Sequence, residues 1–181
     1  MDNRMEIALI YGSDREGRLC DSIANWTAAQ LEKHTDYKLQ RIDPADLPQP
    51  RELRAQLARA EGFVVVTPEY NHGYPAPLKA LIDSAKAEWQ AKPVAFVGYG
   101  GLSGGIRALE QLRLVFAELH AVTLRDSVTF INAWEQFDSD GQLQSPERAE
   151  RSMKRMLAYL HWWLGALRDA RRAQAYGEIA Q

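Results

Sequence analysis

Three short segments of the chain combine residue types that could bind an anionic, planar ligand. The first, residues 12–20, reads Gly-Ser-Asp-Arg-Glu-Gly-Arg-Leu-Cys and carries the Ser13 hydroxyl and the guanidinium groups of Arg15 and Arg18. Hydroxyl, guanidinium and backbone N–H groups at the start of a helix are the groups that bind phosphate. We therefore interpret this segment as a phosphate site, the alternative being an ordinary polar turn with two solvated arginines.

This first segment does not match the two common nucleotide-binding loops. It lacks the Lys-Ser/Thr pair of a P-loop, and Asp14 stands where G-x-G-x-x-G requires its second glycine. Asp43 lies too far from Gly12 to be the acidic residue that follows that motif by about twenty positions. The sequence therefore does not support a dinucleotide fingerprint here.

The second segment, residues 67–77, reads Thr-Pro-Glu-Tyr-Asn-His-Gly-Tyr-Pro-Ala-Pro. Its prolines restrict the backbone, and its two tyrosines and one amide suit a planar ligand whose heteroatoms pair with backbone groups. A rigid structural turn is the alternative. His72 is the only histidine in the three segments, and a lone loop histidine is more often solvated than catalytic.

The third segment, residues 98–105, reads Gly-Tyr-Gly-Gly-Leu-Ser-Gly-Gly. Such a glycine-rich backbone can adopt positive φ angles and approach a ligand closely. Its nearest dinucleotide register begins at Gly98 and meets Ser103 where a glycine or alanine belongs, so that match is weak.

Strand-length apolar runs alternate with segments of helical period along the chain, which predicts a parallel α/β sheet. The predicted strands are Glu6 to Tyr11, Tyr37 to Ile42, Gly62 to Thr67, Pro93 to Tyr99 and Val122 to Phe130. The last helix is predicted to begin with Ser145 as N-cap and Pro146 in its first turn, and Trp162 is predicted to lie off its buried face.

Hydrophobic patterning also predicts the strand order. The first, third and fourth strands are uniformly apolar, as central parallel strands are, whereas the second and fifth interleave polar residues and are predicted to be edges. This favours a flavodoxin-like three-layer sandwich, with a five-stranded parallel sheet of order 2-1-3-4-5 and helices on both faces. In that order the three candidate segments follow neighbouring strands at the carboxyl edge, where ligands of such sheets bind.

Length and composition bound the class of protein. The 181 residues predict a single domain over 1–181, and the net charge of −2 offers no basic surface for nucleic acid or an anionic membrane. Cys20 is the only cysteine, which excludes an intramolecular disulfide and a thiolate-rich metal site. We expect a cytoplasmic protein, and Cys20 is interpreted as a plain small side chain.

Three motifs resemble those of the NAD(P)H-dependent FMN reductase family: Gly-Ser-x-Arg from Gly12, Thr-Pro-Glu-Tyr-Asn-x-x-Tyr-Pro-x-x-Leu-Lys-x-x-Ile-Asp from Thr67, and Tyr-Gly-Gly-x-Ser-Gly-Gly from Tyr99. The resemblance runs from the first strand to Glu118. It implies a flavodoxin-like fold and bound FMN, with NADPH or NADH as transient hydride donor. It further implies quinones, azo dyes, free flavin or metal oxyanions as small-molecule acceptors, and a homodimer or homotetramer.

The same resemblance assigns roles to residues by motif position. Ser13, Arg15 and Arg18 are implied to hold the FMN phosphate; Pro68, Glu69, Tyr70, Asn71 and Tyr74 to hold phosphate, ribityl chain and ring; and Tyr99, Gly100, Gly101 and Ser103 to edge the isoalloxazine, mainly through their backbone. Asp14 and Arg18 depart from the residues that many members carry. A carboxylate near a phosphate is repulsive, so Asp14 is expected to point away or pair with an arginine.

No side chain or metal is assigned a catalytic role, because hydride transfer between nicotinamide and flavin is carried by the cofactor. One flavin face serving donor and acceptor in turn predicts ping-pong kinetics. The main alternative is a flavodoxin-type FMN electron carrier without turnover of its own, although such carriers usually have a strongly acidic face. A flavin-free dinucleotide enzyme and a hydrolase are disfavoured by the failed glycine spacing and the absence of G-x-S-x-G.

Overall fold

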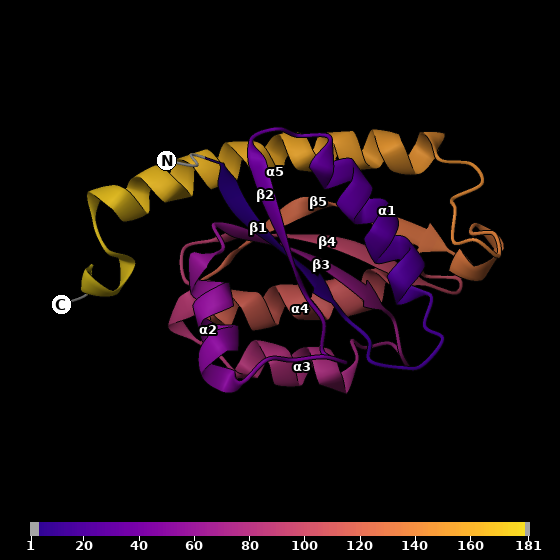
Figure 1. Ribbon diagram of the computed structural model, residues 1–181, viewed down its shortest axis with the longest axis horizontal. Helices are drawn as coiled ribbons and strands as arrows, with labels where there is room; N and C mark the ends of the chain where they lie inside the picture. Colours follow the sequence, from indigo (N-terminus) through magenta and orange to yellow (C-terminus); the bar gives the residue numbers. More distant parts are fainter. Residues whose placement is uncertain (1–3, 180–181) are drawn as a thin grey trace.

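A five-stranded parallel sheet of order β2-β1-β3-β4-β5 forms the centre of the computed structural model, which describes residues 4–179 (Figure 1). The strands are β1 (Met5–Tyr11), β2 (Tyr37–Ile42), β3 (Gly62–Pro68), β4 (Pro93–Gly100) and β5 (Val122–Ile131). The flavodoxin-like order predicted from the sequence is confirmed, and the predicted strand ends differ from these bounds by at most one residue.

The central and edge positions follow from the burial of the strands. Every residue of β3 is buried, and β1 and β4 are buried over almost their whole length, because helices cover both faces of the sheet there. β2 is buried only at its first and last residues and β5 at three of its ten positions, and these two strands form the edges. The edge assignments made from the sequence pattern are therefore confirmed.

Five helices form the two outer layers. They are α1 (Cys20–Glu32), α2 (Pro50–Arg59), α3 (Ala76–Asp83), α4 (Ile106–Glu118) and α5 (Glu147–Ala173). Figure 1 shows α1 and α5 above the sheet and α2, α3 and α4 below it. Each layer packs its apolar stripe on its own face of the sheet, which divides the core into two hydrophobic clusters.

The long helix α5 begins one residue later than predicted. Pro146 occupies the N-cap position instead of the first turn, and Ser145, the predicted N-cap, lies outside the helix. The N-cap proline has helix-like dihedral angles, so the bound of the helix depends on backbone pairing that the Ser-Pro pattern does not specify. Leu160 and Leu164 are buried, whereas Trp162 is 62% exposed, as predicted.

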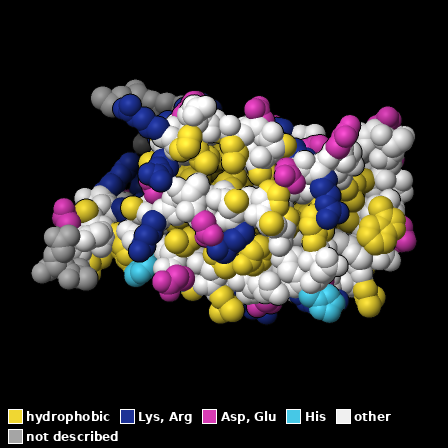
Figure 2. Space-filling view, turned by 90° about the horizontal axis from the view of Figure 1, so that it is seen from below, with side chains coloured by type: hydrophobic (Ala, Val, Ile, Leu, Met, Phe, Trp, Pro, Cys, Tyr) yellow, Lys and Arg dark blue, Asp and Glu magenta, His cyan; other side chains and the backbone are white. Residues whose placement is uncertain are grey.

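The surface of the lower layer carries charges of both signs. Figure 2 shows lysine and arginine side chains interspersed with aspartate and glutamate on this face, with no extended area of a single sign. Within residues 4–179, no helix is long and apolar enough to cross a bilayer. The prediction of one domain over 1–181 stays a prediction.

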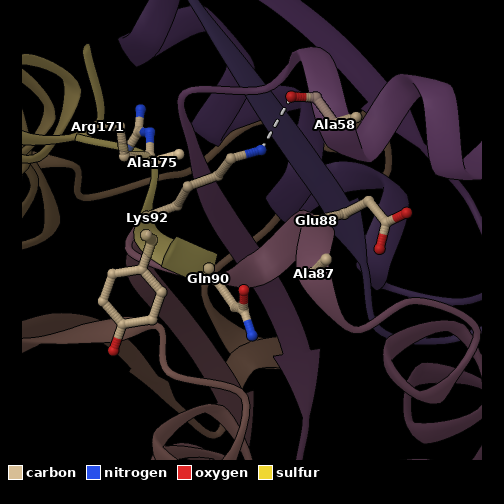
Figure 3. Close-up of a pocket in the computed structure, with 9 residues that line it drawn as sticks. Ala58, Ala87, Glu88, Gln90, Lys92, Arg171 and Ala175 are labelled. Atoms are coloured by element: carbon tan, nitrogen blue, oxygen red, sulfur yellow. Dashed lines mark hydrogen bonds between the residues drawn. The ribbon is translucent and has the colours of Figure 1, made fainter. Parts of the chain in front are cut away.

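A cavity of about 460 Å³ lies at the end of the sheet where β4 begins, away from the carboxyl edge (Figure 3). Lys92 lines it, and its Nζ donates to the carbonyl oxygens of Leu57 and Ala58, at 2.9 and 3.0 Å, in the last turn of α2. Burial and the nearby charge of Arg171 lower the pKa of Lys92 to about 8. The ammonium therefore satisfies the free carbonyls of a helix end, a structural role.

Candidate functional site

The segments that follow β1, β3 and β4 meet at the carboxyl edge of the sheet. We call them the first loop (residues 12–19), the second loop (69–75) and the third loop (101–105). The Gly12 N–H donates to the Val66 carbonyl at 2.7 Å, and a Cβ at Gly12 would lie 2.7 Å from that oxygen. Only glycine therefore fits where the first loop leaves the sheet.

Ser13 and Tyr70 connect the first and second loops. Ser13 is fully buried, and its hydroxyl lies 3.0 Å from the Tyr70 hydroxyl. The Arg15 guanidinium lies over the Tyr70 ring, 3.7 Å from the ring centre, while the Arg15 residue itself is exposed. This cation–π contact holds a positive charge at the surface, beside the start of α1.

Arg18 is held by protein carboxylates. Its Nη1 donates to Asp43 at 2.8 Å, its Nη2 also contacts Asp43, and its Nε donates to Asp21 at 2.9 Å. Nη1 also contacts the Ser13 carbonyl. Burial alone would raise the pKa of Asp43, but hydrogen bonds from Arg18 and from the Ala45 N–H lower it. These contacts use the donors of Arg18 within the protein.

The N-termini of α1 and α4 differ in how their N–H groups are satisfied. At α4, Glu69 accepts a hydrogen bond from the Arg107 N–H at 3.1 Å and pairs with the Arg107 guanidinium at 3.2 Å. At α1, the N-cap residue Leu19 provides no side-chain hydrogen bond. Within residues 4–179, no side chain is seen to cap the first N–H groups of α1, although Asp21 lies in its first turn, so the positive end of the α1 dipole follows directly after the first loop.

Glu69 also fixes the third loop. The Ser103 hydroxyl donates to Glu69 at 2.7 Å, and the side chain of Glu69 is only 8% exposed. Gly104 and Gly105 have φ angles of 62° and 90°, and a Cβ at Gly105 would lie 2.5 Å from the Tyr99 nitrogen. The tight glycine backbone and the carboxylate together hold the third loop in one conformation.

The second loop reverses direction at two residues with positive φ angles. Asn71 (φ 50°) and His72 (φ 69°) lie between Tyr70 and Gly73, which exchange hydrogen bonds of 2.9 and 3.0 Å. Gln111 donates to the His72 carbonyl at 2.9 Å. Non-glycine residues in this conformation are uncommon, and they concentrate at functional sites. Both side chains are exposed at the site.

The remaining predicted site residues lie on the same edge but differ in what they present. Pro68 is buried at the end of β3. Tyr74 is half-buried against the hydrophobic cluster that lies between the sheet and the helices α2, α3 and α4. Tyr99 is 6% exposed, and its side chain belongs to the hydrophobic cluster between the sheet and the helices α1 and α5. It can therefore offer the site only its backbone. Burial raises the pKa of Tyr99. Gly100 and Gly101 leave room above the sheet end, where a Cβ would meet neighbours only at 3.4 Å or beyond.

Trp134, which follows β5 at the same edge, was not predicted as a site residue. Its Cη2 would lie 3.4 Å from a Cβ at Gly101, and the residue is 61% exposed. The predicted site residues came only from the loops after the first, third and fourth strands. An aromatic residue directly after the fifth strand was a usable signal, because all parallel strands end at the same edge.

The residues present fit a ligand with one phosphate and a planar ring, as the resemblance to FMN reductases implies. The start of α1, which has no side-chain cap, and the exposed Arg15 guanidinium provide donors and positive charge for a phosphate, with the Ser13 hydroxyl of the same loop buried beside Tyr70. The clamped glycine backbone of the third loop provides an edge with little side-chain bulk for a flat ring. Asp14 is exposed in the first loop.

Comparison with known proteins gives a family match. The profile described as NADPH-dependent FMN reductase matches residues 5–135. An NAD(P)H-dependent FMN reductase of Schizosaccharomyces pombe is 35% identical over 120 residues, 55% of this chain and 60% of that protein. An NAD(P)H:quinone oxidoreductase of Solanum tuberosum is 37% identical over 114 residues, 59% of this chain and 58% of that protein. The chain thus spans about three fifths of the length of these two relatives.

A solved structure agrees in fold. The flavoenzyme FerB, an NAD(P)H:acceptor oxidoreductase of Paracoccus denitrificans, superposes with a TM-score of 0.70, covering 88% of this chain and 97% of that one. The two sequences are 21% identical, so this likeness concerns the fold.

Proposed function

Because this chain belongs to the NADPH-dependent FMN reductase family, we propose that it is an oxidoreductase that passes hydride from NADPH or NADH through bound FMN to a small-molecule acceptor. The observation that carries the proposal is the placement at one sheet edge of two features: the first loop, with Ser13 and Arg15 ahead of a helix start that has no side-chain cap, and the glycine-rich third loop held by Glu69. Quinones, azo dyes, free flavin and metal oxyanions are the proposed acceptors.

Ser13, Arg15 and the first N–H groups of α1 hold the phosphate in this proposal. The Ser13 hydroxyl and the Arg15 guanidinium are both positioned by Tyr70, which supports their acting together. Arg18, whose donors are engaged by Asp43 and Asp21, supports the first loop from behind and is assigned a positioning role in place of direct phosphate contact.

The second and third loops hold the ribityl chain and the ring. Pro68, Tyr70, Asn71 and Tyr74 contribute from the second loop and its approach; Tyr99, Gly100, Gly101 and Ser103 contribute mainly backbone groups from the third. Glu69 holds the third loop against the end of β3, since its carboxylate binds Ser103 and Arg107. This division suits a ring whose heteroatom edge pairs with peptide groups.

FMN, when bound, would supply the chemistry of hydride transfer between the nicotinamide and the acceptor. The protein binds and orients both partners, and we assign no side chain to proton transfer. His72 is exposed, with its backbone carbonyl held by Gln111. Donor and acceptor use one opening in turn, so the kinetics are ping-pong. We further propose a cytoplasmic homodimer or homotetramer with one domain over 1–181.

The proposal is tested on the purified protein. Flavin released by denaturation is expected to be FMN, at about one per chain, and NADPH or NADH is expected to bleach it in the absence of oxygen. Double-reciprocal plots at several quinone concentrations are expected to be parallel. Binding of FMN without bleaching by either nicotinamide would instead support the electron carrier, and failure to bind FMN would overturn both readings.

A further inference from the structure

An exposed apolar cluster lies beside the third loop, at the carboxyl edge of the sheet. Leu102 is 86% exposed, Trp134 61% and Ile131 40%. We call these three residues the apolar rim. Large apolar side chains gathered in one exposed place commonly mark a binding surface.

The backbone around Trp134 is held firmly against the third loop. The Asn132 N–H donates to the Gly101 carbonyl at 3.1 Å, and Asn132 adopts a left-handed conformation with φ 47°. Trp134 then lies in the short helix η2 (Ala133–Glu135), whose Ala133 is fully buried. The hydrogen bond of Asn132 and the burial of Ala133 therefore hold the backbone that carries the indole, which lowers the conformational cost of using it as a binding surface.

We propose that Trp134 is an acceptor-binding residue, which contacts planar aromatic acceptors of the quinone class at the rim of the flavin site. The inference rests on the proposed function, because Gly100 and Gly101 edge the ring only in that proposal. An acceptor that lies over the ring and extends past the third loop meets the indole, which abuts Gly101. Aromatic stacking on an exposed indole favours large flat acceptors over compact inorganic ones.

The size of the apolar rim favours a small ligand over a second copy of the chain. A stable subunit interface buries roughly 800 Å² on each partner, drawn from about 20 residues or more. Even with Ile106, which is 40% exposed at the start of α4, four exposed side chains around one loop match the dimensions of a bicyclic aromatic molecule much better. The rim also adjoins the site directly, as an acceptor contact must.

The test compares Trp134→Ala and Trp134→Phe with Trp162→Ala. Trp162 is 62% exposed on α5, so it controls for the loss of an equally exposed indole. Affinity for 1,4-naphthoquinone is measured by equilibrium dialysis on the FMN-loaded protein without nicotinamide, where no turnover occurs. KM values for 1,4-naphthoquinone, ferricyanide and NADPH follow, and size-exclusion chromatography with light scattering gives the mass.

Trp134→Ala is expected to weaken naphthoquinone binding and raise its KM about five- to tenfold. The KM for ferricyanide and for NADPH, the FMN content and the mass are expected to stay within twofold of the unsubstituted protein. Trp134→Phe is expected to restore most of the loss, and Trp162→Ala to have no effect.

Equal losses for naphthoquinone and ferricyanide, losses no larger than those of Trp162→Ala, or a fall in mass would each overturn the inference, the last by making the rim a subunit contact. Failure of the proposed function is recognised separately, as an unsubstituted protein that binds no FMN or oxidises no NADPH. If FMN binds but NADPH is not oxidised, naphthoquinone binding to the variants still decides the role of Trp134.

Discussion

Arg18 and Asp43 form a bidentate ion pair that ties the loop after β1 to the end of β2. The Arg18 side chain is 9% exposed and that of Asp43 28%, so the pair is partly shielded from solvent. Most of the donors of Arg18 are spent on Asp43, Asp21 and the Ser13 carbonyl. Arg18, the second arginine of the candidate phosphate site, therefore shapes the first loop, while Arg15 remains at the surface.

The Arg18–Asp43 pair is expected to stabilise the fold. Arg18→Ala is expected to lower the free energy of unfolding by about 1 to 3 kcal/mol, because it leaves a partly buried carboxylate without its charged partner. Urea unfolding measures this, and a double-mutant cycle with Asp43→Asn is expected to show coupling between the two residues.

The pH dependence of this pair follows from the pKa of Asp43, which lies below its usual value of 3.8. A carboxyl with a depressed folded-state pKa contributes stability above its unfolded-state pKa, and that stability is lost as the pH falls through the folded-state pKa. The stability difference between the parent and Arg18→Ala is therefore expected to be complete at neutral pH and to shrink in acid.

A selective loss of FMN affinity in Arg18→Ala, without a change in its free energy of unfolding, would contradict the positioning role of Arg18.

Arg15→Ala is expected to weaken FMN binding about tenfold or more while changing riboflavin binding little. The physical reason is the loss of a charge-assisted hydrogen bond of about 1.5 to 3 kcal/mol to the phosphate, which riboflavin lacks. Flavin fluorescence titration measures both ligands. Arg125→Ala, which removes a guanidinium that is 87% exposed on β5, serves as the matched control. Equal losses for the two flavins would place Arg15 away from the phosphate.

Glu69→Gln is expected to weaken FMN and riboflavin binding alike, by roughly three- to tenfold. The amide keeps one acceptor for Ser103 but loses the charge that pairs with Arg107, so the third loop loosens at the ring and not at the phosphate. Ser103→Ala removes a single hydrogen bond and is expected to show a smaller effect in the same titration. A loss confined to FMN would argue against the clamp.

The difference in free energy of unfolding between the parent protein and Lys92→Met is expected to change in alkaline solution. The pKa of Lys92 is about 8 in the folded protein against 10.5 for the free side chain, so between these values the unfolded chain binds more protons. The parent is therefore expected to gain free energy of unfolding relative to Lys92→Met as the pH rises through this window, by on the order of 2 kcal/mol. Urea unfolding of both proteins at pH 7, 9 and 10 measures it, and a constant difference would be the contrary result.

The order of the sheet and the position of the site could be predicted from local patterns. Uniformly apolar runs such as Phe63 to Val66 mark strands buried on both faces, and alternation in the second and fifth strands marks the edges. Since parallel strands end at one edge, the three loops that carry Ser13, Glu69 and Gly101 had to be neighbours. The period and the hydrophobic pattern of the chain decide these features, and both are visible in a single sequence.

What each side chain does at that edge depended on partners distant along the chain. Asp43 binds Arg18, which lies 25 residues away, and Arg107 and Ser103 bind Glu69 from more than 30 residues away. Trp134 lies beside Gly101 because the paired strands β4 and β5 end next to each other. No local periodicity records such pairings, because they form only when the sheet brings strand ends together. The tertiary structure alone therefore decided which arginine remains at the surface, which carboxylate caps a helix, and which aromatic borders the site.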